Sequence, residues 1–299
     1  MAARAFVLFA FLACSSIATY AAGIDWTAVK NGATFTGDGT FYGQQSNQND
    51  NGTCTFGSNY GNTLGLEWSK GVQTYIALNR PHFDRSNACG LCLMYRGTSG
   101  GIGVTPISSK WTYGFVDNEC PECLEGSIDQ NLNGDGRWKI EWYPIPCNIG
   151  AGKFYYSMFP GAFQHWAMFA ISNTRVPIKS VDALLDGQWR NLTRNFNNNW
   201  PINAQKITFP IQVRVTSILG DTVEDTVPSD KGGAGSAQFP DRGPSFRLDG
   251  TAANPTLTAD PKAPVALPKD LDVFGIADSS SSQASSTQAA ATGRRLMGV

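Results

Sequence analysis

The chain has 299 residues and a formal net charge of −1; 16% of its residues are charged, 11% are aromatic and 32 are glycine. This balance, with a sequence pI near 6.1, argues against nucleic acid or a membrane as partner, since an interaction with either calls for a basic patch. Few charges combined with many aromatic side chains favour a neutral, hydroxyl-rich ligand such as a polysaccharide.

The N-terminus has the form of a secretory signal peptide. Arg4 precedes an apolar run from Ala5 to Ala13, and small residues follow. The run is too short to span a bilayer, so removal of residues 1–22 is favoured over a retained signal anchor. We therefore expect a secreted protein, located outside the cell or in a cell wall, and Cys14 is expected to leave with the signal.

Six cysteines remain after this removal, all in the front half of the chain. Secretion favours disulfide bonds between them. Two C-x-x-C pairs would be typical of a zinc ribbon in a cytosolic protein, but the secretory context disfavours zinc, and a thioredoxin-like role lacks its βαβ context. We expect no metal and no cofactor, and spacing alone leaves many pairings open. The six are Cys54, Cys89, Cys92, Cys120, Cys123 and Cys147.

Residues 23–148 form the first predicted module, a β-rich domain with many turns. Trp138, Ile140 and Trp142 alternate with charged residues, which predicts a strand with one buried face. This strand leads towards the last cysteine and is expected to be the closing edge of the module. The best helix candidate is the stretch 64–79, although glycines and β-branched residues weaken it.

An acidic cluster in this module offers the kind of side chains that glycoside hydrolysis requires, because that reaction uses two facing carboxylates. From the bare sequence, a solvated acidic loop is the favoured interpretation. The cluster consists of Asp117, Glu119, Glu122, Glu125 and Asp129.

The segment 129–136 resembles the front of a calcium loop, with oxygen-bearing side chains at alternate positions and Gly134 at the sixth. The twelfth position is Ile140, where such a loop needs Glu, and Arg137 stands at the ninth. We therefore predict a tight turn.

Residues 149–242 form the second predicted module, which has no cysteine. The run 207–216 alternates apolar and polar side chains, and Pro210 within it predicts an edge strand or a bulge. Asp186-Gly187 between Leu184-Leu185 and Gln188-Trp189 is a strong hairpin signal. Strands at this spacing suggest a small β-sandwich.

Two glycosylation sequons and a low-complexity tail complete the chain. In a secreted protein, Asn51 and Asn191 are glycan acceptors and are expected on exposed turns. The segment 243–299 is rich in Pro, Ser and Ala and cannot bury enough apolar surface to offset its ordering entropy. We expect it to be a disordered tail.

Short motifs occur in a characteristic order through both modules. They are Thr40–Gly43, Ala88–Cys92, Phe115–Asp117, Cys120–Cys123, Ser127–Asp129 and Gly134–Cys147 in the first module, and Gly152–Phe154, His165–Ala167, Asp186–Trp189, Val213–Thr216 and Asp225–Pro228 in the second. In this order they resemble the expansin family of secreted wall-loosening proteins, and microbial members more than plant ones. The resemblance covers about residues 36–242.

The resemblance implies an all-β fold: a six-stranded double-psi β-barrel, then an immunoglobulin-like, carbohydrate-binding β-sandwich. It also implies a shallow groove across both modules that holds a glucan chain. By the same resemblance, the expected disulfides are Cys54–Cys89, Cys92–Cys147 and Cys120–Cys123.

The resemblance also carries residue roles in the barrel. Asp129 matches the essential groove aspartate, Asp117 a second groove acid, and Thr40 a hydroxyl hydrogen-bonded near the essential aspartate. Tyr42 is assigned to the groove from the same opening motif, Thr40–Gly43. The alternative is that its side chain belongs to the barrel core. The groove tyrosine that some microbial members place after Asp117 is not evident, because Glu119 or a cysteine stands there.

In the second module the resemblance implies a line of aromatic side chains that stacks on sugar rings. Trp166 matches one of them and Phe196 stands where the family often has Tyr. His165 falls where a second Trp is common, which predicts a weaker stacking surface. Trp189 and Trp200 are alternatives, although a buried core position is the commoner role for tryptophan in a sandwich.

The leading hypothesis is a secreted, monomeric, expansin-like protein that binds cellulose, xyloglucan or another glucan and loosens polymer networks without hydrolysis. One rival is an endoglucanase with Asp129 as general acid; Asp38 and Asp50 flank the region where its second carboxylate would lie. The other rival is a polysaccharide-binding or structural wall protein that loosens nothing.

Overall fold

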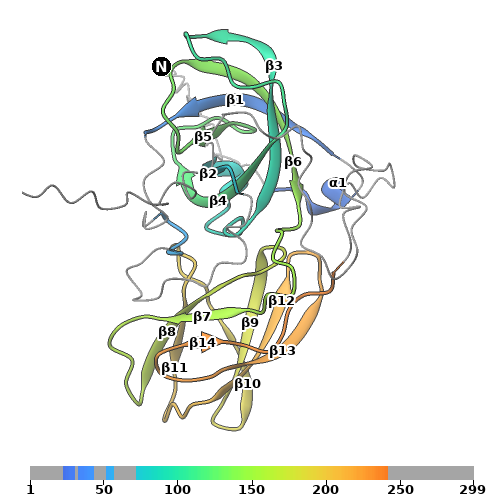
Figure 1. The fold of residues 1–299 in the computed structure, drawn as a ribbon. Coiled ribbons are helices and arrows are strands. Elements are labelled where there is room, and N and C mark those ends of the chain that lie inside the picture. The colour runs from blue at the N-terminus through green and yellow to red at the C-terminus, as the bar shows by residue number, and fades with distance from the viewer. Residues whose placement is uncertain (1–22, 31–32, 44–51, 57–71, 242–299) are drawn as a thin grey trace, which may run out of the picture.

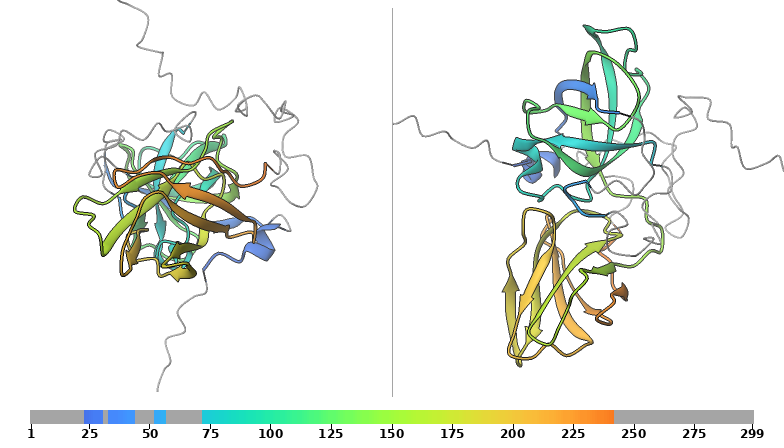
Figure 2. Two further views of the ribbon diagram at one scale, coloured as in Figure 1. Left: turned by 90° about the horizontal axis from the view of Figure 1, so that it is seen from below. Right: turned by 90° about the vertical axis from the view of Figure 1, so that its left-hand side faces the viewer.

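The computed structural model describes residues 23–30, 33–43, 52–56 and 72–241, and these form two β-rich modules stacked end to end (Figure 1). The first module is a closed six-stranded barrel and the second consists of two four-stranded sheets. Figure 2 shows the same two modules from below and from the side. The predicted all-β fold, a double-psi barrel followed by an immunoglobulin-like sandwich, is confirmed. The predicted disordered tail lies outside the described residues.

The barrel strands follow the order β1-β5-β2-β4-β3-β6, and β1 closes the ring by pairing with β6. The β1–β5 and β2–β4 pairs are parallel. The strands are β1 (Phe35–Phe41), β2 (Thr74–Asn79), β3 (Cys92–Ile102), β4 (Thr112–Cys120), β5 (Ile128–Gln130) and β6 (Arg137–Ile145), with short helices α1 (Trp26–Lys30) and α2 (Arg80–Phe83) beside them. Within the described ranges, no helix is long and apolar enough to cross a membrane.

Two expectations for the barrel were wrong. The helix candidate 64–79 ends in strand β2, whose six side chains are all buried between two neighbouring strands; a short, fully buried apolar run carries no periodicity that separates strand from helix. The rest of that candidate, up to residue 71, lies outside the described residues. Strand β6 has the expected buried Ile140 and Trp142, but it pairs on both sides and is not an edge.

The three disulfides join the cysteines in the expected pairs: Cys54–Cys89, Cys92–Cys147 and Cys120–Cys123. The first two bridges lie in the apolar core of the barrel. They close long segments of the chain, with sequence separations of 35 and 55 residues. The third bridge closes a turn, with a separation of 3. The barrel is thus held by two buried long-range bridges and one local bridge.

Close backbone contact fixes the short strand β5 against β1. Gly126, just before β5, has a φ of 81°, and a Cβ built there would lie 2.0 Å from the carbonyl oxygen of Thr36. Only glycine fits both the left-handed backbone and this approach. The indole N–H of Trp142 donates to the Gly126 carbonyl at 2.8 Å from inside the barrel.

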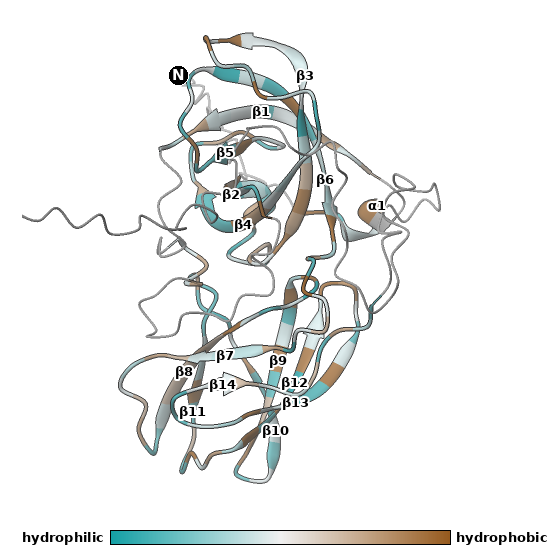
Figure 3. Ribbon diagram, viewed as in Figure 1, coloured by the Kyte–Doolittle hydropathy of each residue, from teal (hydrophilic) through white to brown (hydrophobic). Residues whose placement is uncertain are grey.

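The second module is a sandwich of two sheets, with orders β10-β9-β12-β13 and β11-β8-β7-β14. Its separate apolar core includes Phe154, Tyr156, Phe169 and Trp200. Figure 3 shows polar and apolar residues alternating along its strands. The strands are β7 (Tyr155–Met158), β8 (Trp166–Ser172), β9 (Ile178–Leu185), β10 (Gln188–Leu192), β11 (Trp200–Asn203), β12 (Ile211–Ser217), β13 (Thr222–Val227) and β14 (Gly233–Ala234).

Local predictions in the sandwich had mixed outcomes. The Asp186-Gly187 hairpin is confirmed: both residues have positive φ and join β9 to β10. The alternating run forms β12, but Pro210 precedes it, and the strand is central rather than at an edge. Asn191 is exposed as expected, yet it lies on strand β10 and not on a turn. Asn51 lies outside the described residues.

The segment 195–199 of the sandwich forms much of the contact with the barrel. The ring of Phe196 packs edge-on against Phe83 of the barrel, with centroids 6.5 Å apart. Polar contacts surround this pair and fix the modules against each other. They are Thr55 Oγ1 to Asn197 O (2.9 Å), Ser86 Oγ to Asn195 O (3.2 Å) and Asn198 Nδ2 to Cys54 O (3.3 Å).

Candidate functional site

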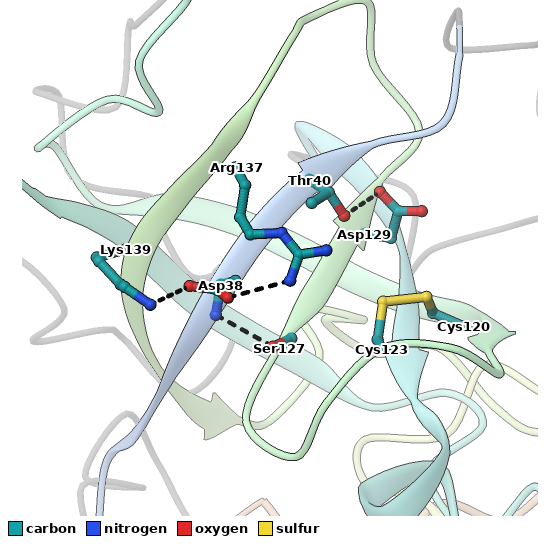
Figure 4. A network of polar contacts seen from close by, with 8 residues as sticks. All are labelled: Asp38, Thr40, Cys120, Cys123, Ser127, Asp129, Arg137 and Lys139. Atoms are coloured by element: carbon teal, nitrogen blue, oxygen red, sulfur yellow. Dashed lines mark hydrogen bonds and ion pairs between the residues drawn. A yellow bond between two sulfur atoms is a disulfide. The ribbon is translucent and has the colours of Figure 1, made fainter. Parts of the chain in front are cut away.

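The parallel pairing of β1 with β5 places Thr40 directly beside Asp129. The Thr40 hydroxyl donates a hydrogen bond of 2.7 Å to Oδ1 of Asp129 (Figure 4). The two residues lie 89 positions apart in the sequence, so only the barrel brings them together. The pair that the family resemblance implied is present in the structure.

The neighbouring Gln130 explains why the Asp129 side chain lies on the outside of the barrel. Successive residues of a strand face opposite ways. Gln130 is buried and accepts a 2.6 Å hydrogen bond from the hydroxyl of Tyr95, so Asp129 is turned outward. Ala77 of β2 pairs with Asp129 and, on its other side, with Asn118 of β4. We call the row Thr40, Asp129, Ala77 and Asn118 the barrel face.

The pKa of Asp129 is raised above its ordinary value, chiefly by partial burial. The hydrogen bond from Thr40 acts in the opposite direction because it stabilises the ionised carboxylate, whereas the negative charge of Glu122 adds to the rise. Asp129 therefore holds its proton to a higher pH than a free aspartate does.

Beside this pair, Asp38 of β1 is held between two cations of β6. Lys139 Nζ lies 2.5 Å from Asp38 Oδ1, and Arg137 Nη1 lies 3.3 Å from Oδ2 (Figure 4). The hydrogen bond from Lys139, and then the Arg137 guanidinium, hold the pKa of Asp38 below its usual range. Its backbone N–H donates to Ser127 Oγ at 3.1 Å. These cation contacts could not be predicted from sequence, because about 100 residues separate the partners.

Asp117 lies on β4, separated from Asp129 by β2. In the β2–β4 pairing, Ile76 faces Val116 and the next residue, Ala77, faces Asn118, so Asp117 is the extra residue of a bulge. Bulges redirect side chains and are common beside active sites. Asp117 is only 8% exposed.

Tyr75 is a neighbour of Asp117 that sequence reasoning missed. Burial, followed by the charge of Asp117, raises the pKa of Tyr75 to about 12. A tyrosine thus lies near Asp117, but it comes from β2 rather than from the segment after Asp117. Tyr42 is 37% exposed, which excludes the barrel-core alternative for it. Its backbone N–H donates to the Gln130 carbonyl at 3.0 Å, so it follows directly on the barrel face.

The acidic cluster does not form one facing pair of carboxylates. Glu119 is buried and bonds to Nε of Arg80 at 2.6 Å. A carboxylate oxygen of Glu125 lies 3.6 Å from Nε2 of His82. Of the cluster, Asp129 is the member that the Thr40 hydroxyl holds on the barrel face. The segment 129–136, predicted as a tight turn, begins with the last two residues of strand β5 and bends only after them; the would-be calcium ligand Asp135 accepts the backbone N–H groups of Val104 and Thr105.

The Cys120–Cys123 bridge lies against Asp129 (Figure 4). The two sulfur atoms and a carboxylate oxygen of Asp129 all lie within 4.8 Å of one another. With the sulfurs bonded to each other, they are not thiolates and cannot act as the ligands that zinc prefers.

The sandwich carries an aromatic cluster at the β7–β8 turn, made of Phe159, Phe163, His165 and Trp166. Phe163 stacks on Trp166 with centroids 6.3 Å apart and an interplanar angle of 26°, and Phe159 meets Trp166 edge-on at 5.9 Å. Phe163 is 57% exposed and Phe159 is 38% exposed. Sequence reasoning named His165 and Trp166 but missed both phenylalanines, which fill out the surface around Trp166.

Phe196 is 52% exposed, and its ring packs against Phe83 of the barrel. Met168 shares a face of β8 with Trp166, and the side chain of Asn195 contacts its sulfur. Trp166, Met168 and Phe196 thus lead along the sheet towards the barrel.

The alternative tryptophans lie elsewhere. Trp200 is 1% exposed and belongs to the core. Trp189 is on β10 of the other sheet, beneath the guanidinium of Arg214 at 3.9 Å.

Comparison with known proteins finds similarity to expansins and expansin-like proteins. Residues 153–238 match the family model described as the expansin-like protein middle domain. The chain is 28% identical over 122 residues to Expansin-YoaJ of Bacillus subtilis (strain 168), covering 38% of this chain and 52% of that protein. It is 25% identical over 207 residues to Expansin-like protein 5 of Dictyostelium discoideum, covering 67% of this chain and 80% of that protein. The alignment thus spans about half the length of the Bacillus protein.

The fold has a counterpart among solved structures. A mutant of the Clavibacter michiganensis expansin, crystallised in complex with cellohexaose, superposes with a TM-score of 0.55. The superposition covers 70% of this chain and 98% of that chain, at 20% sequence identity. At this identity the likeness concerns the fold.

Proposed function

Because this chain belongs to the expansin-like family, we propose that it is a secreted protein that binds cellulose or a related glucan and loosens polymer networks without hydrolysis. The observation that carries the proposal is the Thr40–Asp129 pair on the barrel face, with an aromatic surface on the adjoining module. The cellohexaose complex of the Clavibacter expansin supports a glucan as the ligand.

The aromatic cluster supplies binding surface for sugar rings. Trp166 pairs with Asn203, whereas Phe169, three residues along β8, pairs with Trp200 next to the module contact. At the usual rise of a strand, Trp166 thus lies about 10 Å farther from the barrel than Phe169 does. A glucan that stacks on Trp166 and extends past Phe196 reaches the barrel.

Among the residues that the structure describes, Asp129 is the acid that the Thr40 hydroxyl holds on the barrel face. Hydrolysis needs a second carboxylate as base or nucleophile at a defined separation. Asp38 lies two residues from Thr40 on the same face of β1, but its oxygens face Lys139 and Arg137. A carboxylate held in two ion pairs is a weakened base. This supports loosening by hydrogen bonding to glycosidic oxygens over the endoglucanase alternative; Asp50, the other early acid, lies outside the described residues.

The test measures three quantities on the same purified protein: binding to insoluble cellulose, creep of a heat-killed wall, and release of reducing ends. We expect binding and creep with no release above background. Asp129→Asn should abolish creep and keep binding within about twofold. Creep that survives this substitution would refute the role of Asp129; reducing ends released in proportion to protein, and lost in the variant, would establish an endoglucanase.

Tryptophan variants test the binding surface. Trp166→Ala should weaken cellulose binding about tenfold, which corresponds to about 1.4 kcal/mol. Trp189→Ala is the matched control, because it removes a tryptophan from the opposite sheet and should leave binding unchanged. Equal losses in both variants would contradict the proposed surface. Binding without creep in the unmodified protein would favour the non-loosening wall protein.

A further inference from the structure

The Cys120–Cys123 bridge differs from the other two disulfides in exposure and in loop length. Cys120 is 3% exposed, within the 0% to 4% of the other four cysteines, whereas Cys123 is partly exposed at the surface of the barrel. The bridge closes a segment with a sequence separation of only 3, and a short loop contributes less to stability than a long one. A reductant can therefore reach this bridge selectively, and the two buried bridges continue to hold the barrel.

The open bridge would leave three good metal ligands around one point. The two sulfurs and a carboxylate oxygen of Asp129 already lie within 4.8 Å of one another. In a four-coordinate zinc site with bonds of about 2.0–2.3 Å, neighbouring ligand atoms are separated by roughly 3.3–3.8 Å. With Cα atoms 5.4 Å apart, the cysteines reach that separation by side-chain rotation. Their C-x-x-C spacing on a turn is the one that zinc sites use.

The local charge also favours a cation. Glu122 stands between the two cysteines in sequence, is exposed, and acts with its negative charge on Asp129. The nearby cations Lys139 and Arg137 are engaged by Asp38. Glu122 or a water molecule is available as a fourth ligand.

We propose that reduction of the Cys120–Cys123 disulfide creates a site for a thiophilic divalent cation such as Zn²⁺, with Cys120, Cys123 and Asp129 as its protein ligands. A dithiol reductant attacks the more accessible sulfur, that of Cys123, and the S–S bond breaks. The second thiol of the reductant then displaces Cys123, so the reductant leaves as its own disulfide and the protein gains two electrons and two protons. Binding of the cation as the bis-thiolate releases the two thiol protons.

The site uses the carboxylate that the barrel face presents, so a bound cation and a glucan oxygen compete for Asp129. The intact disulfide thus leaves the Asp129 carboxylate available to the polysaccharide. Reduction of the disulfide lets the cation bind that carboxylate instead. The metal site itself does not depend on the proposed function, because its ligands are defined by geometry alone.

The test uses Co²⁺ as a probe, since four-coordinate Co²⁺ bound to thiolates has strong near-ultraviolet charge-transfer and visible d–d absorption. The full chain is reduced mildly with a phosphine, freed of it without oxygen, and titrated. Alkylation and mass spectrometry verify that only Cys120 and Cys123 have opened. We expect one Co²⁺ per reduced chain, displaced by Zn²⁺, and none in the oxidised chain or in the Cys120→Ala/Cys123→Ala variant.

Two carboxylate variants complete the design. Asp129→Asn should weaken binding by at least about tenfold, whereas Asp135→Asn, which alters an exposed barrel carboxylate bonded to backbone N–H groups, should not change it. A reduced chain that binds no Co²⁺ with its near-ultraviolet circular dichroism intact would overturn the proposal. So would equal affinity in Asp129→Asn, or loss of the barrel's circular dichroism upon selective reduction.

Discussion

Removal of single disulfides should reveal how unequally the three bridges stabilise the barrel. The two variants to compare are Cys92→Ala/Cys147→Ala and Cys120→Ala/Cys123→Ala. The first opens a bridge with a sequence separation of 55, the second one with a separation of 3. Both remove the same atoms, so the difference between them isolates loop length and burial.

Loop-closure entropy gives the size of the expected loss of stability in each variant. A bridge across 55 residues stabilises by about 4 kcal/mol at 25 °C, whereas one across 3 contributes about 1.5 kcal/mol. Cys92 and Cys147 are also 0% and 2% exposed, so their removal leaves a cavity that adds to the loss. We therefore expect the Cys92/Cys147 variant to be less stable than the Cys120/Cys123 variant by at least about 2.5 kcal/mol.

Amide hydrogen exchange of the barrel strands β3 and β4, read by mass spectrometry, measures this difference without interference from the sandwich. The slowest amides exchange by global opening, so their protection reports the free energy of unfolding of the barrel. Equal losses in the two variants, or a larger loss for Cys120/Cys123, would refute the loop-length argument and also the premise that this bridge can be opened with the barrel intact.

Further expected outcomes concern single side chains. Tyr156→Phe removes a hydroxyl that donates to buried Asp225 at 2.9 Å. The free energy of unfolding of the sandwich, measured in urea, should fall by about 1.5–3 kcal/mol. A decrease well below that range would contradict the stabilising role of this hydrogen bond. Thr40→Val removes a donor to ionised Asp129, so the pKa of Asp129 should rise further, seen in a carboxyl ¹³C titration as a transition at higher pH. The pKa of Asp38 is lowered by folding, so the stability that its charge contributes is present above its ordinary value of about 3.9 and is lost as pH falls through the lower folded value. The Tm difference between the parent chain and Asp38→Asn should therefore shrink below about pH 4, and a constant difference would contradict the ion pairs.

The fold could be predicted well where the chain alternates and turns locally. The β6 strand, the β12 strand and the Asp186-Gly187 hairpin all follow from patterns within a few residues. Strand β2 could not be recognised, because it is buried on both sides and its apolar run has no alternation. The central position of β12 was hidden for a different reason: Pro210 lies within the periodic run but before the hydrogen-bonded part.

The candidate site depended more on family resemblance than on pattern. Motifs assigned Asp129 and Thr40, and the structure joins them across the parallel β1–β5 pair. The charges around them could not be assigned, because Asp38 meets its cations across strands that are far apart in sequence. The same applies to Tyr75 and the bulge at Asp117, since strand register is not readable from one sequence.

The contact between the modules bears directly on how one glucan could meet both surfaces. Phe196 is at once an exposed aromatic ring and a neighbour of Phe83 in the barrel. The hydrogen bonds of the segment 195–199 to the backbone and side chains of the barrel restrict rotation between the modules. When a second contact is intramolecular, a fixed geometry gives it a high effective concentration.

It follows that the weak stacking surface predicted from His165 need not bind tightly by itself. Under the proposed function, a glucan held at Trp166 and directed past Phe196 would be presented repeatedly to Asp129, whose pKa is raised. The proposed loosening would then require many brief exchanges of hydrogen bonds, which modest affinity would permit and tight binding would slow. On this argument, variants that strengthen stacking, such as His165→Trp, should increase cellulose binding but raise the creep rate less than in proportion, and a proportional rise would show that binding alone limits the process.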